Sequence, residues 1–328
     1  IIIIVGGRMV LNDELALGVM VAFIFYVQRF FDPIRSLTIQ YSMMQRAMVS
    51  GQRILEVLDV PEAIRDKPNA LELTTCQGQV EFNKVSFAYV SDTPVLTDIS
   101  FKISAGEKVA LVGPTGSGKS TVAALLRRFY DVSSGEVLLD GNDIRNLSQI
   151  SLGRQMSMVL QEPYLFSGSI FENIQYSNTH KTPADVEAAA QAVGAHDFIT
   201  RLPGGYDFVV DQRGGNLSLG ERQLISFARA LVADTRILIL DEATANVDSY
   251  SEMKIQKALK LLLQGRTAIV IAHRLATVRE CDRILVLHHG RLEEEGNHDQ
   301  LIVKNGLYAR LYRMNYGSFD DLVVAHKD

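Results

Sequence analysis

The chain has 328 residues, enough for one large or two modest folded domains, and its 47% hydrophobic and 22% charged residues are those of an ordinary folded protein. Its formal net charge of −5 argues against the extended basic surface that long nucleic-acid contacts require, so we expect no nucleic-acid partner. Its two cysteines, Cys76 and Cys281, fit neither a disulfide framework nor a zinc-binding spacing, which favours reduced cytosolic thiols.

The N-terminal zone, from Ile1 to about Leu37, is the most apolar part of the sequence. It begins with isoleucines rather than methionine and contains no signal peptide with a cleavage site, so we expect a fragment of a longer chain. The uncharged run Leu15–Val27 is shorter than the roughly 20 residues of a membrane-spanning helix, so its hydropathy favours a span and a buried core helix about equally. The flanking charges favour a span with a cytoplasmic C-terminal side: Asp13 and Glu14 before it, and Arg29, Arg35, Arg46 and Arg53 after it.

A helix is predicted to continue beyond this run. Its apolar residues recur at intervals of three and four, the pattern of a narrow packing seam: Ile34, Leu37, Tyr41, Met44 and Met48. We expect this seam to pack against neighbouring helices, while methionines lining a substrate path are the alternative. Pro33 is expected to kink the helix, and the segment Pro61–Pro68 is predicted to be a linker.

The third zone, about Gln77 to Met314, alternates short apolar runs with helical patterns. The predicted strands are Val80–Phe87, Lys108–Val112, Met156–Leu160, Arg236–Leu240, Thr267–Ala272 and Arg283–Leu287. The predicted helices are Thr121–Tyr130, Ser218–Ala233 and Ser249–Leu263. This alternation indicates an α/β domain with a largely parallel sheet. The tail after Tyr316 is polar and is expected to fray.

A phosphate-binding loop is predicted at Gly113–Ser120, which fits the pattern G-x-x-x-x-G-K-[ST] between a predicted strand and a predicted helix. Its glycines allow backbone N–H groups to form an anion nest, and the following helix presents its positive N-terminus to the same phosphates. Lys119 can then reach the β- and γ-phosphates, and Ser120 can bind Mg²⁺. A glycine-rich turn with a chance lysine is the alternative, which the strand–loop–helix context disfavours.

Two carboxylates follow the buried strand Ile237–Leu240. We expect Asp241 to hold Mg²⁺, directly or through water, as in other P-loop NTPases. Glu242 would lie beside the γ-phosphate and polarise the attacking water. A strand that ends in Asp-Glu is more often a surface turn, but the accompanying phosphate-binding loop favours a functional site.

The segment Leu217–Gln223 adds a marker of a particular family. It resembles the LSGGQ signature of ATP-binding-cassette (ABC) transporters, with Leu219 in place of the first glycine and Glu221 in place of glutamine. Further family elements are matched in order: Tyr89 resembles the aromatic residue that stacks on adenine, Gln161 the Q-loop glutamine, Ala245–Asp248 the D-loop and His273 the switch histidine. The N-terminal zone resembles the last helices of the membrane domain in six-helix exporters of the half-transporter type.

The resemblance implies an α/β P-loop NTPase with a RecA-like core and mixed sheet, an antiparallel β subdomain and a helical signature subdomain, preceded by a membrane-spanning helix. It implies a membrane-domain fragment at 1–59, a linker at 60–77, an ABC nucleotide-binding domain at 78–316 and a tail at 317–328. It also implies an ATP-hydrolysing subunit of an inner-membrane exporter with a cytoplasmic nucleotide-binding domain. Its partners would be a second half-transporter subunit, the bilayer and a drug, lipid or peptide-like substrate.

The resemblance assigns site residues for ATP and Mg²⁺. Nucleotide contacts fall on Tyr89, Gly113, Pro114, Thr115, Gly116, Ser117, Gly118, Lys119, Ser120, Thr121, Gln161, Asp241, Ser218, Gly220, Glu221 and Asp248. The catalytic set is Glu242, His273, Gln161 and Lys119, and the Mg²⁺ set is Ser120, Gln161 and Asp241. Two ATP molecules would lie between two head-to-tail domains, with Ser218 of one chain facing the γ-phosphate held by the other.

Two departures from the family pattern affect this expectation. Glu221 places a carboxylate where the family has an amide. If Glu221 forms a capping box with Ser218, it stays clear of the phosphate; if it does not, it weakens ATP binding in trans. Gln212 stands where the coupling loop commonly has glutamate, which leaves coupling between domains open at that loop. Homodimer, heterodimer and a partner with a degenerate site all remain open.

Other function classes fit less well. Glu242 and His273 disfavour a subunit that binds ATP without hydrolysing it. The apolar zone disfavours a soluble ABC ATPase of DNA repair or translation. A GTPase or small-molecule kinase would need neither the signature nor Tyr89, and the sequence contains no N-K-x-D motif that reads guanine.

Overall fold

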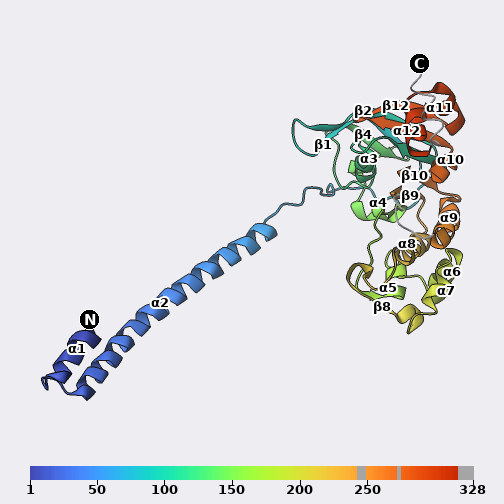
Figure 1. The fold of residues 1–328 in the computed structure, drawn as a ribbon. Coiled ribbons are helices and arrows are strands. Elements are labelled where there is room, and N and C mark those ends of the chain that lie inside the picture. Colours follow the sequence, from blue (N-terminus) through green and yellow to red (C-terminus); the bar gives the residue numbers. More distant parts are fainter. Residues whose placement is uncertain (242–248, 272–274, 317–328) are drawn as a thin grey trace. The chain divides into compact units, whose positions relative to one another are not determined.

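The structure is a computed structural model that describes residues 1–241, 249–271 and 275–316 (Figure 1). It divides into two units, Ile1–Ala63 and Ile64–Asp328. The first unit holds α1 (Ile2–Leu11) and α2 (Leu17–Leu58), which contact one another. Within the described residues, α2 is the one helix long and apolar enough to cross a membrane. Its 42 residues run through Pro33 and span about 60 Å, twice the roughly 30 Å of a bilayer's hydrocarbon core.

The second unit is built on a mixed six-stranded sheet with the order β12-β11-β3-β10-β9-β6. Its strands are β3 (Lys108–Val112), β6 (Met156–Val159), β9 (Ile237–Asp241), β10 (Thr267–Ile271), β11 (Arg283–His288) and β12 (Arg291–Gly296). All neighbours pair in parallel except β11 and β12. The parallel strands are almost wholly buried, which explains their continuous apolar runs.

A second, antiparallel sheet has the order β2-β1-β4-β5. It consists of β1 (Val80–Ala88), β2 (Pro94–Ile103), β4 (Ser134–Leu139) and β5 (Asn142–Asp143). Helix α3 (Lys119–Leu126) shares one hydrophobic cluster with both sheets: Val122 and Leu125 pack with Phe82 of β1 and Ile239 of β9. Helix α3 therefore packs against residues of both sheets.

Helices form the other end of the second unit (Figure 1). Helix α8 (Leu219–Ala233) contacts α5 (Ile170–Gln175), α6 (Pro183–Ala192) and α9 (Ser249–Leu263). The remaining described helices are α4 (Gln149–Gln155), α7 (His196–Ile199), α10 (Leu275–Arg279), α11 (His298–Lys304) and α12 (Leu307–Tyr316). Short 3-10 helices lie at Ile144–Asn146, Gly205–Asp207 and Gln212–Gly214. Strand β7 (Gly168–Ser169) pairs with β8 (Val209–Val210). The buried residues of α8 belong to a separate cluster from those of α3.

The predicted fold class is confirmed, with small differences in the elements. The helix expected at Thr121–Tyr130 begins at Lys119 and ends at Leu126, because Arg128 adopts a left-handed φ of 56° and the amide of Phe129 bonds back to the carbonyl of Ala124 at 2.9 Å. Strands β2, β4 and β12 and the two-residue strands β5, β7 and β8 had not been predicted. The expected tail 317–328 lies outside the described residues.

Candidate nucleotide-binding site

The loop 113–118 joins the buried strand β3 to helix α3. Gly116 and Gly118 have φ values of 81° and 101°, a backbone conformation that glycine adopts without strain. A Cβ on Gly118 would lie 2.4 Å from Cδ2 of Leu96, so a larger residue there would force Leu96 to shift. Ser117 is 3% exposed, and its Oγ is the one buried side-chain oxygen without a hydrogen-bond partner among the described residues. The loop thus holds a buried hydroxyl for which a bound anion would be a hydrogen-bond partner.

Lys119, the first residue of α3, folds back over this loop. Its Nζ donates to the carbonyl oxygens of Gly113 at 2.8 Å and Pro114 at 2.9 Å, and the residue is 7% exposed. Burial lowers the pKa of this ammonium, and the negative charge of Asp241 partly opposes the shift. The structure therefore holds a buried cation at the mouth of the loop, near the carboxylate that ends β9.

The predicted site residues Asp241 and Gln161 lie at the carboxyl-terminal ends of the parallel strands, which form one edge of the sheet. Strands β3, β10, β9 and β6 are parallel, so their carboxyl ends share that edge. Asp241 ends β9 and pairs with Ile271 of β10. Gln161 follows β6 by two residues and is exposed. These two residues therefore lie at the same edge as the loop 113–118.

Three predicted site residues, Glu242, Asp248 and His273, lie outside the described residues. Glu242 directly follows Asp241 in the sequence, and His273 comes two residues after the end of β10. Their roles stay predictions.

Tyr89, predicted to stack on adenine, lies beside the phosphate-binding helix. Its hydroxyl is 3.1 Å from Oγ1 of Thr121 on α3, and its ring is half exposed. The ring meets Phe87 and Tyr130 edge-on, with centroids 4.8 and 5.0 Å away. Tyr130 extends this aromatic surface and had not been predicted; its position just past the phosphate-binding helix is the signal that could have revealed it.

The signature begins helix α8, and its capping box is confirmed. The Oγ of Ser218 accepts a hydrogen bond from the amide of Glu221 at 3.3 Å, and Oε2 of Glu221 accepts from the amide of Ser218 at 2.8 Å. The carboxylate of Glu221 is thus turned to its own helix. Buried residues of α8 and α3 belong to different hydrophobic clusters, which hold alternate residues of β3, β9 and β10, so the two helices cover opposite faces of the six-stranded sheet.

Arg229 of α8 is a further residue that sequence reasoning missed. It donates to the carbonyl oxygen of Asn173 at 2.7 Å, to Oδ1 of Asn173 at 2.9 Å and to the carbonyl oxygen of Tyr164 at 3.0 Å. Its guanidinium lies 5.7 Å from the ring centroids of Phe166 and Tyr176. Burial lowers the pKa of Arg229 to about 10. These contacts join the segment after Gln161 to the signature helix.

A phosphate-binding loop between a buried strand and a helix, together with a neighbouring strand that ends in aspartate, defines a P-loop nucleotide-binding protein. A family model described as ABC transporter matches residues 96–245. The chain is 49% identical over 313 residues to the uncharacterized ABC transporter ATP-binding protein YknV of Bacillus subtilis (strain 168), covering 95% of this chain and 52% of that protein.

Two further similarities name transport proteins. The chain is 43% identical over 315 residues to the ATP-dependent lipid A-core flippase of Syntrophus aciditrophicus (strain SB), covering 96% of this chain and 52% of that protein. A solved structure of a bacterial Atm1-family ABC exporter with ATP bound superposes with a TM-score of 0.77 at 39% identity, covering 93% of this chain and 54% of that one. The chain belongs to the ABC transporter family and carries its nucleotide-binding ATPase domain. It spans about half the length of these relatives.

Proposed function

We propose that the chain is the ATP-binding and ATP-hydrolysing part of an ABC exporter. The observation that carries the proposal is the buried ammonium of Lys119, which bonds to two carbonyl oxygens of the loop 113–118 at the carboxyl ends of the parallel strands, near Asp241. In this proposal, residues 1–59 belong to the membrane domain, 60–77 to a linker, 78–316 to the cytoplasmic nucleotide-binding domain and 317–328 to a tail. The proposed activity is export of a drug, lipid or peptide-like substrate across the inner membrane; the similar proteins that support it are a lipid A-core flippase and an exporter.

The residues in and around the loop 113–118 suit a magnesium nucleotide. Ser120, Gln161 and Asp241 offer the oxygen ligands that Mg²⁺ prefers, and the bound ion would neutralise charge on the β- and γ-phosphates. Lys119 would exchange its two carbonyl partners for phosphate oxygens, and the free Oγ of Ser117 would gain a partner. We propose that Tyr89 stacks on the adenine, because its half-exposed ring lies beside α3.

For hydrolysis, we propose that Glu242 accepts a proton from the attacking water. Gln161 and His273 would orient that water and the γ-phosphate. These roles rest on the family pattern together with the position of Gln161 at the sheet edge.

A second chain completes the proposed site. Ser218 and Gly220 begin an α-helix whose N-terminus can bind an anion, yet this helix and α3 belong to different parts of the same unit. Two head-to-tail domains would therefore each present a signature, with Glu221 and Asp248, to the ATP held by the other. Because Glu221 caps its own helix, its charge is directed to Ser218, which is compatible with an ATP bound in trans.

The test uses the full chain in detergent micelles, with ATP binding measured by titration and hydrolysis by phosphate release. Glu242→Gln should bind ATP as the wild type does and hydrolyse it at least about 100-fold more slowly, the loss typical for one group that stabilises the transition state. Wild-type activity should rise with the square of chain concentration, as a site shared by two chains requires. Hydrolysis by Glu242→Gln at the wild-type rate would remove Glu242 from its role.

A further inference from the structure

The segment Ile64–Leu73, here called the docked linker, connects the first unit to the strands of the second and is fastened to the second along its length. The carbonyl oxygen of Ile64 accepts from Nε2 of Gln149 at 3.1 Å, and that of Leu73 accepts from Nε2 of Gln155 at 3.1 Å. Between these ends, Leu71 exchanges backbone bonds of 2.8 and 2.9 Å with the turn before α4. The docked linker is therefore an ordered part of the nucleotide-binding unit.

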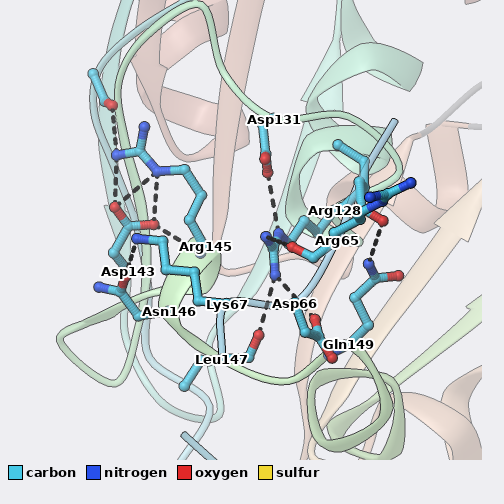
Figure 2. A network of polar contacts seen from close by, with 12 residues as sticks. Arg65, Asp66, Lys67, Arg128, Asp131, Asp143, Arg145, Asn146, Leu147 and Gln149 are labelled. Atoms are coloured by element: carbon cyan, nitrogen blue, oxygen red, sulfur yellow. Dashed lines mark hydrogen bonds and ion pairs between the residues drawn. The ribbon is translucent and has the colours of Figure 1, made fainter. Parts of the chain in front are cut away.

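Arg128, just past the C-terminus of α3, is the centre of this attachment (Figure 2). The residue is 4% exposed, and its guanidinium donates to the carbonyl oxygens of Leu147 at 3.1 Å and Arg65 at 3.3 Å. It also bonds Oδ1 of Asp131 at 3.1 Å and lies 3.5 Å from Oδ1 of Asp66. A buried cation of this kind needs these partners, so the end of the phosphate-binding helix is tied directly to the docked linker.

Asp66 connects the docked linker to a second element. Its two carboxylate oxygens accept hydrogen bonds from the backbone amide of Gln149 at 3.0 and 3.1 Å, at the start of α4. Helix α4 leads without a break into β6, and β6 ends shortly before Gln161. The carboxylate of Asp66 thus contacts Arg128, just past the end of α3, and the amide of Gln149 at the start of α4. Helix α4 and strand β6 lead from there to Gln161.

The chain connectivity gives this contact a mechanical consequence. Helix α3 has eight residues and is about 12 Å long, and Arg128 follows its last residue by two, so a displacement at Lys119 would be carried along the helix to within two residues of Arg128. Helix α2 ends at Leu58, and Ile64 is the first residue of the docked linker, so only residues 59–63 separate them. A movement of the docked linker would therefore act on α2 through these five residues of the chain.

We propose that Arg128 and Asp66 are positioning residues that couple nucleotide binding to helix α2 through the docked linker. The inference rests on the proposed function, because it takes ATP as the ligand that displaces α3. It assigns roles to two residues outside the nucleotide site. A merely structural role would keep the docked linker folded but would not make its response depend on ATP.

The experiment places a spin label at the joint between the units. In the full chain in detergent micelles, with Glu242→Gln to prevent turnover, Ala63→Cys provides an exposed thiol beside Ile64. Selective labelling is feasible because Cys281 is buried, while burial and the neighbouring Asp140 raise the pKa of Cys76 to about 12. The mobility of the label is compared by electron paramagnetic resonance with and without magnesium-ATP, and ATP affinity is measured by titration on the same samples.

The coupling predicts that magnesium-ATP changes the mobility of the label, and that Asp66→Asn reduces this change at least threefold while ATP affinity stays within twofold. Asp66→Asn keeps the shape of the side chain and an acceptor for the amide of Gln149, so it removes mainly the charge facing Arg128. Asp59→Asn, which removes an exposed carboxylate on the other side of the label, is the matched control and should keep the full response. Asp66→Glu should restore part of it.

Three outcomes separate the possibilities. A full response in Asp66→Asn with ATP bound would overturn the coupling role of Asp66. ATP binding without any response of the label in the Asp66 parent chain would overturn the inference and leave the proposed function standing. No ATP binding by the parent chain would overturn the proposed function itself. Should Asp66→Asn melt before the measurement, Arg128→Lys gives the same comparison, since lysine keeps the charge but cannot reach all four partners.

Discussion

Replacing Lys119 by methionine removes a buried charge from the phosphate-binding loop and keeps the length of the side chain. In the structure, this ammonium bonds to the carbonyl oxygens of Gly113 and Pro114 and is almost fully buried. It has therefore lost its hydration before ATP arrives, and its bonds can be exchanged for bonds to phosphate oxygens without further desolvation. The affinity for ATP should depend strongly on this one side chain.

The magnitude follows from the two bonds that are exchanged. A hydrogen bond that involves a charged group contributes about 1.5–3 kcal/mol, and the bonds of the ammonium to carbonyl oxygens already involve one charge, so only part of this value is gained when the acceptor is charged as well. Exchanging two carbonyl acceptors for phosphate oxygens should thus gain about 2–3 kcal/mol in all. Because each 1.4 kcal/mol is a factor of about ten, Lys119→Met should bind ATP about 30- to 150-fold more weakly.

Lys119→Met also tests how the free energy of unfolding depends on pH. Burial lowers the pKa of Lys119 in the folded protein, so at alkaline pH the unfolded chain binds more protons than the folded one. The free energy of unfolding of the wild type should then rise with pH between the lowered pKa and the ordinary value for lysine, while the penalty of the buried charge stays complete below that window. Lys119→Met should lack this contribution.

The assay is ATP titration by calorimetry on the full chain in detergent, and thermal unfolding from neutral to alkaline pH. Lys257→Met, an exposed lysine of α9, is the matched control and should bind ATP as the wild type does. An affinity of Lys119→Met within threefold of the wild type would refute the reasoning, because it would mean that Lys119 contacts no phosphate.

Two further substitutions test the geometry around the site. Gly118→Ala places a Cβ 2.4 Å from Leu96 at a residue whose φ is 101°. The resulting strain of about 1–3 kcal/mol should lower the melting temperature and weaken ATP binding. An unchanged melting curve would contradict the described turn. Arg229→Met removes three hydrogen bonds to carbonyl and amide oxygens and should lower the free energy of unfolding in urea by about 2–4 kcal/mol. The exposed Arg201→Met should change it by less than about 0.5 kcal/mol, and equal effects of the two substitutions would show that the Arg229 contacts contribute nothing.

The parts of the fold that follow from local pattern were predictable from the sequence. The buried parallel strands have uninterrupted apolar runs, so β3, β9 and β10 were expected close to their observed bounds. The capping box of Ser218 and Glu221 is likewise local, because its two partners are three residues apart. The same holds for the loop 113–118, whose spacing specifies its backbone.

The parts that depend on distant contacts were not predictable. Strand β2 contains polar and apolar residues in an irregular order, and its pairing with β1 includes shifts in register. The mixed charges of Pro61–Pro68 indicated only a linker, whereas the partners of Asp66 and Arg65 lie more than 60 residues away in the sequence. Tyr130 and Arg229 acquire their neighbours in the same way, through packing of elements that no local pattern links.

The central claim is that one triphosphate is held by the loop 113–118 of one chain and by the signature helix of a second. A cryo-electron microscopy map of the Glu242→Gln chain with magnesium-ATP tests it directly. The account predicts the β- and γ-phosphates within hydrogen-bond distance of Nζ of Lys119, with Ser218 of a second copy over the γ-phosphate. A triphosphate bound away from Lys119 would contradict the site, and an occupied loop with no second chain over it would contradict the proposed ATP-driven pairing.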